Sequence, residues 1–482
     1  MADRKPVIIT PEQMAEQRAF MQEVLDMPQR PRSYYVVTYG CQMNAHDSEK
    51  LAGMLQEMGM TEAADREHAD FVIFNTCCVR DNAERRALGN VTWLKEVRKQ
   101  NPNLIIAVCG CMIQQPGMAE KILKQYKFVD LAFGTSNLYR LPELLSRTLN
   151  SDRPVVEVED EDTIAEDLPV KRLRTDAAYI TIMYGCDNFC SYCIVPYVRG
   201  RERSRRMEDI LREAQQLRDS GVKEIMLLGQ NVNSYGKGLP GGVTFAELLR
   251  RLDEMGIPRI RFMTSHPKDL SDELIDVMAH SRHILPQFHL PVQAGNDEIL
   301  RRMNRHYDRA RYLDRVRALR SAVPGISLTT DIIVAFPGET EEQFQDTMSL
   351  VREVGYDFAY MFKYSERPGT FAQRNLGDDI PEDVKTRRLT EIIDLQNILS
   401  EQSNKRDVGK EFEILVECTS KRSEEQLSGR TSQNKMVVFD RGDHKVGDYV
   451  KVRITGCSSA TLFGEEIKSV SYTHLTLPTI LL

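Results

Sequence analysis

Three cysteines in one short segment carry the strongest chemical signal of the sequence. Cys186, Cys190 and Cys193 have the spacing C-x3-C-x2-C and directly follow a predicted strand, so one loop can bring three thiolates to a single metal centre. A structural zinc ion takes four ligands, whereas a four-iron cluster held by three cysteines keeps one iron open for a substrate or cofactor. The spacing therefore predicts an iron–sulfur cluster with an open iron. A zinc site with a distant fourth ligand is the alternative interpretation.

A second set of cysteines lies in the N-terminal part of the chain. Cys41, Cys77 and Cys111 each come just after a predicted strand, and the carboxyl ends of parallel strands meet at one edge of a sheet. This recurrence predicts a second cluster, with inert buried thiols as the alternative. Cys78 and Cys109 lie close by in the sequence. Because neighbouring residues of an extended segment point opposite ways, at most one of Cys77 and Cys78 should be a ligand.

The elements that must position the second set form an alternating series within residues 33–150. Strands that alternate with helices predict an open parallel α/β sheet. The predicted strands are Tyr34–Tyr39, Phe71–Asn75, Leu104–Cys109 and Phe128–Phe133, and the predicted helices are Ser48–Met58, Ala83–Lys99 and Tyr139–Thr148. Residues 1–32 are polar and are predicted to be a mobile or helical N-terminal extension.

A second alternating series, within residues 172–405, must position the first set. Six strands with helices between them predict a partial or complete α/β barrel. The predicted strands are Tyr179–Met183, Ile225–Leu228, Arg259–Met263, Phe288–Pro291, Ser327–Val334 and Phe358–Phe362. Residues 151–171 are predicted to be an acidic linker, because the stretch Pro154–Val170 holds seven acidic residues and no basic one.

The pattern of the sequence changes after a charged helix predicted at Pro381–Lys405. Short alternating segments separated by turn residues predict a small all-β barrel over residues 406–470. Its predicted strands are Lys410–Glu417, Met436–Phe439, Tyr449–Ile454 and Leu462–Ser469. Residues 471–482 are apolar and uncharged, and we expect them to be a non-native tail.

Composition sets further limits on function. The 482 residues include 64 Lys and Arg against 71 Asp and Glu, a net charge of −7, which excludes a uniformly basic nucleic-acid binder but allows a local basic face. No apolar run is long enough to span a membrane, and the charged N-terminus lacks a signal-peptide core. We therefore expect a cytoplasmic protein, in which ten cysteines indicate metal or redox chemistry rather than disulfides.

The C-x3-C-x2-C segment, with Tyr192 before its last cysteine, resembles the radical S-adenosylmethionine (SAM) family. The resemblance implies that Cys186, Cys190 and Cys193 hold a catalytic [4Fe-4S] cluster. Its open iron would chelate the amino and carboxylate groups of SAM, and one electron would cleave SAM to a 5′-deoxyadenosyl radical. The partial or full α/β barrel of this family agrees with the strand count.

The same resemblance implies where the chain contacts SAM. Gly229, Gln230 and Asn231 match the position of the family's cofactor-amino motif, although the glutamate common there is absent. Gln293 and Asp331 follow later strands of the barrel, where barrel enzymes place their chemistry, and we expect them to hold the ribose or the substrate. Ordinary polar strand ends are the alternative interpretation for each of these residues.

Across Ser33–Ser469 the chain resembles the methylthiotransferases. These place a cluster-bearing N-terminal domain before a radical SAM barrel and a small β-barrel called TRAM. The ligands of the second [4Fe-4S] cluster would be Cys41, Cys77 and Cys111, with Cys78 and Cys109 spare. Three segments resemble the branch that modifies isopentenyl-adenosine in tRNA, namely Tyr39–Asn44, Asn75–Cys77 and Gly429–Phe439.

The resemblance implies methylthiolation of C2 of N6-isopentenyladenosine beside the tRNA anticodon. The second cluster would supply the sulfur, a second SAM molecule would supply the methyl group, and a flavodoxin or ferredoxin would supply the electrons. We expect the protein to be a monomer. One alternative is a methylthiotransferase acting on threonylcarbamoyl-adenosine tRNA or on a ribosomal protein. Another is a non-catalytic iron–sulfur protein that binds RNA.

Clusters of basic residues predict where an anticodon stem-loop would bind, because arginine and lysine neutralise phosphates. Arg199, Arg201 and Arg203 follow the cysteine loop, together with Arg205 and Arg206. Arg301–Arg320 contains eight arginines against two aspartates, with a solvated helix face as the alternative. In the terminal domain, Arg430 and Lys435 are expected to hold the anticodon arm.

Overall fold

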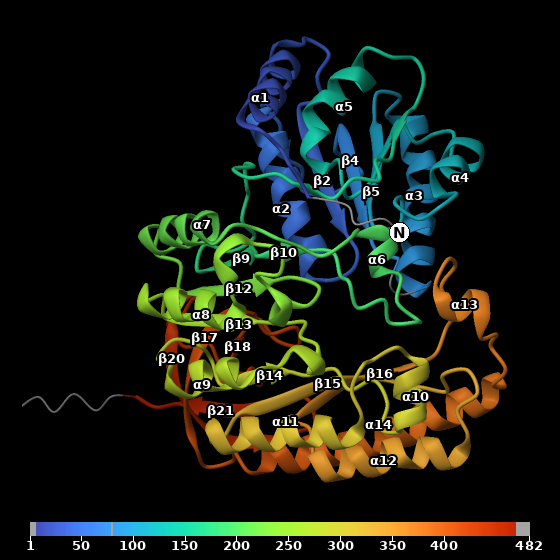
Figure 1. Ribbon diagram of the computed structural model, residues 1–482. Helices are drawn as coiled ribbons and strands as arrows, with labels where there is room; N and C mark the ends of the chain where they lie inside the picture. Colours follow the sequence, from blue (N-terminus) through green and yellow to red (C-terminus); the bar gives the residue numbers. More distant parts are fainter. Residues whose placement is uncertain (1–5, 79–80, 469–482) are drawn as a thin grey trace, which may run out of the picture.

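The computed structural model describes residues 6–78 and 81–468, which form three parts (Figure 1). The N-terminal part is a parallel sheet with the strand order β3-β2-β4-β5-β6-β7. Its strands are β2 (Ser33–Thr38), β3 (Thr61–Glu62), β4 (Phe71–Thr76), β5 (Ile105–Gly110), β6 (Leu131–Phe133) and β7 (Val155–Glu157). The open parallel α/β sheet predicted from the sequence is therefore present.

Helices cover both faces of this sheet, which is why its central strands are continuous apolar runs. The helices are α2 (Gln42–Glu57), α3 (Asp81–Gln100), α4 (Met118–Gln125) and α5 (Leu141–Leu149), with a short η1 (Leu138–Arg140) before the last. Side chains alternate along β4, so that Phe71 and Ile73 pack with α2 and α5 while Val72 and Phe74 pack with α3 and α4.

Within the described part of the predicted extension, residues 6–32, one long helix packs on the sheet domain. Thr10 caps helix α1 (Pro11–Asp26) with a capping box, and α1 packs against α5. Strand β1 (Val7–Ile8) pairs with β8 (Thr163–Ile164).

The predicted linker at 151–171 is corrected in part. Val155–Glu157 is the edge strand β7, and Glu157 and Glu159 both pair with Arg140. Its acidic residues thus have partners in the fold that the sequence pattern did not indicate.

The central part is a partial barrel of six parallel strands. They are β9 (Ala177–Thr181), β12 (Glu224–Leu228), β13 (Arg259–Phe262), β14 (Gln287–His289), β15 (Ser327–Val334) and β16 (Phe358–Lys363). They form two three-stranded sheets, β9-β12-β13 and β14-β15-β16, joined by an isolated bridge between Ile260 and Ile284. Within residues 6–78 and 81–468 the end strands β9 and β16 do not pair, so the barrel is open rather than complete.

Helices wrap the outside of the barrel and bury its large apolar core. The long ones are α7 (Met207–Asp219), α8 (Phe245–Glu254), α9 (Asp272–His280), α11 (Arg309–Ala322), α12 (Glu341–Val354) and α14 (Glu382–Lys405). Shorter elements shape the loops at the strand ends: β10 (Met183–Tyr184), α6 (Val195–Val198), β11 (Arg203–Ser204), η2 (Val232–Ser234), η3 (Pro240–Gly242), η4 (Pro267–Asp269), α10 (Asp297–Arg302) and α13 (Phe371–Asn375).

The terminal part is the predicted small β-barrel, and it is closed. Its strands are β17 (Glu411–Thr419), β18 (Gln426–Arg430), β19 (Met436–Asp440), β20 (Tyr449–Cys457) and β21 (Leu462–Glu466). Ile414, Leu427 and Phe439 lie in its core. The sequence did not predict β18. The tail predicted at 471–482 lies outside the described residues.

Candidate active site

The first cysteine set lies on a tight loop after β10. At Gly185 the backbone angle φ is +69°, and a Cβ atom there would lie 2.0 Å from the carbonyl oxygen of Arg201, so only glycine fits. Inside the loop, the amide of Cys193 donates to the carbonyl of Cys190 at 2.9 Å. The segment therefore folds back on itself and presents its three thiols from one turn.

The three thiols of this set are neighbours in an enclosed site. Burial raises the pKa of Cys186 to about 12, and the charge of Cys190 adds to this effect. Burial also raises the pKa of Cys193 well above its ordinary value, with Cys190 and Cys186 contributing. Because metal ligation requires thiolates, loading this site with a cluster would release protons.

A buried arginine that the sequence analysis did not single out faces this set. Arg305 is 4% exposed, and its Nη1 donates to Cys190 Sγ at 3.3 Å. Tyr307 Oη and the carbonyl of Pro291 accept from the same guanidinium at 3.0 and 2.7 Å. Arg305 thus places a fixed positive charge beside a candidate cluster ligand.

The second cysteine set lies at the carboxyl edge of the N-terminal sheet. Cys41 precedes α2, and Cys77 and Cys111 follow β4 and β5. A Cβ atom added to Gly40 would lie 2.7 Å from Cys77 Cβ, so these two loops touch. Burial raises the pKa of Cys111 to about 12, and the charges of Cys77 and Cys41 contribute, which places the three thiols in one neighbourhood.

Cys78 and Cys109 lie in apolar surroundings. Cys109 belongs to the core that α2 and α5 cover, and Cys78 to the core on the opposite face of the sheet. Burial raises the pKa of both thiols well above the ordinary value. Their packing is that of small apolar side chains.

Each set offers three thiols, the number that a four-iron cluster with one open iron would take. Among the residues that the structure describes, no three Cys, His, Asp or Glu side chains are arranged to hold one metal ion. A zinc site requires four ligands at about 2.0–2.3 Å from one point. A four-iron cluster would instead offer a separate iron to each cysteine.

Arg199 joins the two cysteine sets. It lies six residues after Cys193 in the sequence, and its Nε donates to Cys111 Sγ at 3.2 Å. Its Nη2 donates to Asp47 Oδ2 at 2.7 Å and to Asn44 Oδ1 at 3.3 Å. The loop that follows the first cysteine set therefore reaches into the site of the second.

Buried side-chain atoms without a hydrogen-bond partner gather at the carboxyl ends of the barrel strands. Gln230 Oε1, Asn231 Oδ1 and Gln293 Oε1 are buried and accept no hydrogen bond from any described residue. Two residues that the sequence analysis missed also have side-chain atoms without a partner: Asn233 at Oδ1 and Nδ2, and His266 at Nε2. Native proteins rarely leave such groups unsatisfied, so this end of the barrel is suited to a polar ligand.

Backbone strain marks the same end of the barrel. Thr264, Gln293 and Ala335 follow β13, β14 and β15, and their φ angles are +71°, +71° and +56°. Non-glycine residues adopt such angles rarely, mostly where function requires it. A Cβ atom on Gly229 would lie 2.5 Å from Met183 Cγ, so β12 also ends at a position that demands a small residue.

Two further residues predicted to contact SAM lie nearby. Tyr192 packs edge-on against Phe336, with ring centres 6.5 Å apart. Asp331, on β15, lies 3.6 Å from His289 Nε2. Their roles in SAM binding stay predictions.

Arg199 and Arg203, two of the arginines predicted to bind RNA, are buried in the protein instead, while RNA binding by Arg201 stays a prediction. Arg199 and Arg203 are 7% and 6% exposed, and Arg203 Nε donates to the carbonyl of Thr163 at 2.9 Å. Arg201, which is more exposed, pairs with Asp187 at 2.7 Å. The sequence shows the charge of such residues but not the distant partners that bury them.

Lys435 and Arg430 also have partners within the protein. Lys435 Nζ lies 2.6 Å from Asp407 Oδ2 and donates to Ser403 Oγ at 2.8 Å, and its role in RNA binding stays a prediction. Arg430 pairs with Glu417 at 3.3 Å and remains about one-third exposed.

The segment from Arg430 to Asn434 docks the small barrel onto the open one. Arg259 donates to the carbonyl oxygens of Arg430 and Thr431 at 3.2 and 3.1 Å. Arg261 donates to Asn434 Oδ1. Beside this contact lies a cavity of about 290 Å³ whose lining residues come from all three parts of the chain.

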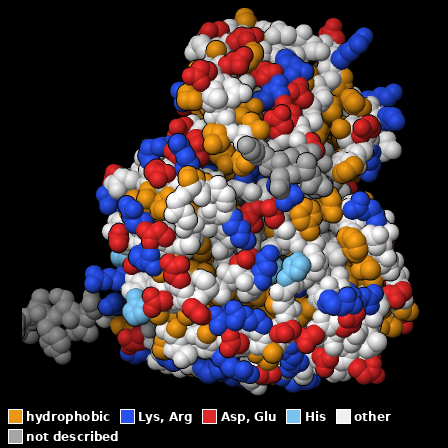
Figure 2. All heavy atoms as spheres, in the orientation of Figure 1, with side chains coloured by type: hydrophobic (Ala, Val, Ile, Leu, Met, Phe, Trp, Pro, Cys, Tyr) orange, Lys and Arg blue, Asp and Glu red, His pale blue; other side chains and the backbone are white. Residues whose placement is uncertain are grey.

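The arginine run 301–320 divides between the interior and the surface. Arg305 and Arg315 are buried, whereas Arg301 pairs with Glu298 and Arg317 with Glu353 on the surface. On the face seen in Figure 2, basic and acidic side chains are interspersed.

Comparisons with known proteins agree with this arrangement. Three family models match the chain: the uncharacterized protein family UPF0004 over residues 33–134, the radical SAM superfamily over residues 180–351 and the TRAM domain over residues 405–467. Among solved structures, the radical S-adenosylmethionine methyltransferase TsrM from Kitasatospora setae has a TM-score of 0.50 at 15% identity. The match covers 68% of this chain and 72% of TsrM, and it supports the fold alone.

Full-length relatives are much more similar. The tRNA-2-methylthio-N(6)-dimethylallyladenosine synthase of Alkaliphilus oremlandii is 50% identical over 97% of this chain and 100% of its own length. The enzyme of the same name from Acetivibrio thermocellus is 49% identical over 97% of this chain and 99% of its own length. The chain therefore belongs to the family of tRNA-2-methylthio-N(6)-dimethylallyladenosine synthases, within the radical SAM superfamily.

Proposed function

We propose that this enzyme methylthiolates C2 of N6-isopentenyladenosine beside the anticodon of tRNA. The observation that carries the proposal is the pair of three-cysteine sets, which Arg199 links through its hydrogen bond to Cys111. The names of the half-identical relatives favour isopentenyl-adenosine over the alternative substrates. Membership of the radical SAM superfamily implies one [4Fe-4S] cluster and SAM, and we propose a second [4Fe-4S] cluster on Cys41, Cys77 and Cys111.

The reaction explains why a radical enzyme is needed. The C2–H bond of adenine is not acidic enough for a side-chain base, so hydrogen must leave as an atom. The clusters and two SAM molecules would supply the radical, the sulfur and the methyl group, replacing C2–H by C2–S–CH3. We propose a flavodoxin or ferredoxin as the low-potential electron donor.

The side chains of the protein would bind and orient these groups. Cys186, Cys190 and Cys193 would hold the radical-generating cluster, with the charge of Arg305 beside Cys190. Gln230, Asn231 and Gln293 carry buried oxygens without partners, which are suited to polar hydrogens of SAM. Tyr192, Gly229 and Asp331 complete the proposed SAM contacts. Holding the reactants in place removes much of the entropic barrier to reaction.

The TRAM domain and the tRNA-modifying relatives support tRNA as the macromolecular partner. We propose that an anticodon stem-loop binds as a single-stranded loop whose adenosine is turned out toward the barrel. We also propose that the enzyme acts as a monomer in the cytoplasm, where its tRNA and reductant would be. No helix among the described residues is long and apolar enough to cross a membrane.

An anaerobic assay with synthetic stem-loops tests this function. The reconstituted enzyme is given SAM, a reductant and one of three stem-loops, which carry isopentenyl-adenosine, threonylcarbamoyl-adenosine or plain adenosine. Mass spectrometry of the nucleosides should show a methylthiolated product only with isopentenyl-adenosine. A product from the threonylcarbamoyl substrate, or from a ribosomal protein alone, would assign the enzyme to another branch.

A further inference from the structure

His266 is a buried histidine at the carboxyl end of β13, and one of its ring nitrogens has no partner in the protein. The side chain is 3% exposed. The backbone amide of Lys268 donates to its Nδ1 at 3.3 Å, so the proton of the neutral ring lies on Nε2. No described residue accepts a hydrogen bond from Nε2. His266 therefore holds a buried N–H donor that lacks an acceptor, which native proteins rarely tolerate.

The ring of His266 is neutral at physiological pH. Burial lowers its pKa well below the ordinary value, and the positive charges of Arg305, Lys268 and Lys237 add to this effect. Asp269 offsets part of this charge, because it lies 3.4 Å from Lys237 and 4.0 Å from Lys268. His266 is thus a neutral hydrogen-bond donor in positive surroundings, which favour an acceptor with negative charge.

This donor lies close to the first cysteine set. The ring of His266 packs edge-on against Tyr307, with ring centres 5.6 Å apart. Tyr307 Oη accepts from Arg305 Nε at 3.0 Å, and Arg305 Nη1 donates to Cys190 Sγ at 3.3 Å. Two side chains therefore connect His266 to a candidate cluster ligand.

Two other buried donors without a partner lie at this end of the barrel, among the residues that the structure describes. They are Asn233 Nδ2 in η2 and Tyr364 Oη directly after β16. Burial raises the pKa of Tyr364, and the charges of Glu366 and Asp378 add to this effect, so its surroundings disfavour an anion. The amide of Asn233 can donate or accept equally well. Of the three, His266 is the donor best suited to an anionic acceptor.

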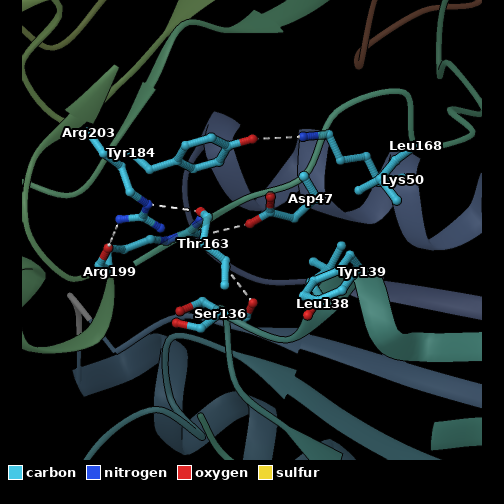
Figure 3. Close-up of a pocket in the computed structure, with 12 residues that line it drawn as sticks. Asp47, Lys50, Ser136, Leu138, Tyr139, Thr163, Leu168, Tyr184, Arg199 and Arg203 are labelled. Atoms are coloured by element: carbon cyan, nitrogen blue, oxygen red, sulfur yellow. Dashed lines mark hydrogen bonds and ion pairs between the residues drawn. The ribbon is translucent and has the colours of Figure 1, made fainter. Parts of the chain in front are cut away.

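Buried cations at the junction of the N-terminal domain and the barrel, by contrast, have partners inside the protein (Figure 3). In a cavity of about 40 Å³ there, Lys50 donates to Tyr184 Oη at 3.3 Å, and Arg199 pairs with Asp47 at 2.7 Å. Arg203 donates to the carbonyl of Arg199 at 2.9 Å. None of these side chains has a buried atom left without a partner, so the cavity requires no ligand.

We propose that His266 Nε2 donates a hydrogen bond to the carboxylate of SAM. The carboxylate is the only negative group of SAM, whose binding is implied by membership of the radical SAM superfamily. The buried oxygens of Gln230, Asn231 and Gln293 can accept from the ammonium and hydroxyl groups of SAM, but they cannot donate to its carboxylate. His266 provides that donor. The inference rests on the SAM site of the proposed function and adds a residue to it.

Two substitutions separate the N–H donor from the structural role of the ring. An asparagine oxygen can replace Nδ1, and a glutamine amide can replace Nε2, so His266→Asn keeps the bond from Lys268 while His266→Gln keeps the donor. Calorimetric titration of SAM into the cluster-loaded protein should show roughly 10- to 100-fold weaker binding for His266→Asn and a smaller loss for His266→Gln. His280→Asn, at an exposed position, should bind SAM as the wild type does.

Decarboxylated SAM identifies the group that His266 contacts. His266→Asn and the wild type should bind this analogue equally, because it lacks the acceptor. Equal affinity of the two proteins for SAM, or an equal loss of affinity for both ligands, overturns the proposal. Weaker binding of an anticodon stem-loop with unchanged SAM affinity would assign Nε2 to RNA and overturns it too. Failure of the wild type to bind SAM would overturn the SAM site of the proposed function as well, so the two failures are distinguishable.

Discussion

Arg199 donates a hydrogen bond to Cys111 Sγ at 3.2 Å across the junction of the N-terminal and barrel domains. The arginine is 7% exposed and is held by Asp47, so its position is fixed. The sulfur that it contacts is a proposed ligand of the second cluster. Hydrogen bonds to cluster sulfurs and nearby charge both affect reduction potential, which gives this contact a measurable consequence.

Replacing Arg199 should make the second cluster harder to reduce. Arg199→Met removes a positive charge and one N–H···S bond, so the reduction potential should fall, while Arg199→Lys should fall less. The measurement is a redox titration followed by electron paramagnetic resonance, in a chain whose Cys186, Cys190 and Cys193 are alanines. Arg206→Met, at an exposed position, is the control. If Arg199→Met holds its full iron content and has the same reduction potential as the chain with Arg199, this role is refuted.

Gln230 should matter for SAM binding and not for folding. Its Oε1 is buried without a partner, so Gln230→Leu should leave the unfolding temperature unchanged or raise it. Losing a hydrogen bond worth about 1–1.5 kcal/mol should weaken SAM binding roughly tenfold. Calorimetric titration of SAM into the cluster-loaded protein measures this.

A second buried glutamine provides the matched control for Gln230. Gln396 Oε1 is also unpartnered, but its Nε2 donates to the carbonyl of Tyr356 at 2.9 Å. Gln396→Leu should therefore lower stability and leave SAM affinity unchanged. If both variants bind SAM as tightly as the wild type, Gln230 is not a SAM contact.

The contact between Asn434 and Arg261 should couple the small barrel to the large one. Asn434→Gly suits the φ angle of +68° at this position but leaves the buried Arg261 guanidinium with one partner fewer. We expect the free energy of unfolding to fall by about 1–3 kcal/mol and proteolysis between α14 and β17 to become faster. Asp443→Ala, on an exposed turn of the same barrel, should change neither.

Deleting the small barrel is a less specific test of its role. A chain ending near Asp407 would leave Arg259 without its acceptors at Arg430 and Thr431 and Arg261 without Asn434. Loss of activity in that chain would then reflect damage to the large barrel as well as weaker RNA binding. Point substitutions on the exposed surface avoid this difficulty.

RNA binding by the small barrel should depend on its exposed cations. Arg430 and Lys435 have partners within the protein, whereas Lys421 and Arg422 lie exposed in the turn between β17 and β18. Lys421→Glu with Arg422→Glu should weaken binding of an anticodon stem-loop. The slope of log affinity against log salt should fall by about one unit for each phosphate that the variant no longer neutralises.

The control for RNA binding is Lys99→Glu, which changes charge on a distant surface. Affinity is measured by fluorescence anisotropy at several salt concentrations. An unchanged salt slope in the Lys421 and Arg422 double variant would move the RNA surface to another part of the chain.

The strands of the fold were largely predictable because burial leaves a strong pattern. All six barrel strands were placed correctly to within a few residues, since each is a short segment rich in apolar or β-branched residues between turn residues. Strand β18, Gln426–Arg430, was missed because its five residues include Gln, Ser, Gly and Arg, which are weak strand signals.

The roles of charged residues were harder to predict than the strands. Arg199 and Asp47 are 152 residues apart, and nothing local distinguishes a buried arginine from one that binds phosphate. Arg305 was included in a basic run and was not recognised as the neighbour of Cys190. In contrast, both cysteine sets were identifiable because their spacing and their places after strands are local features.

The most direct test of the two-cluster account measures two products in one anaerobic reaction. Mass spectrometry quantifies 5′-deoxyadenosine and the methylthiolated nucleoside for two triple-alanine variants, each with its iron content determined. Alanine at Cys41, Cys77 and Cys111 should preserve 5′-deoxyadenosine and abolish the methylthiolated nucleoside, whereas alanine at Cys186, Cys190 and Cys193 should abolish both. A methylthiolated nucleoside formed by the Cys41, Cys77 and Cys111 variant, or full iron content in it, would contradict the account.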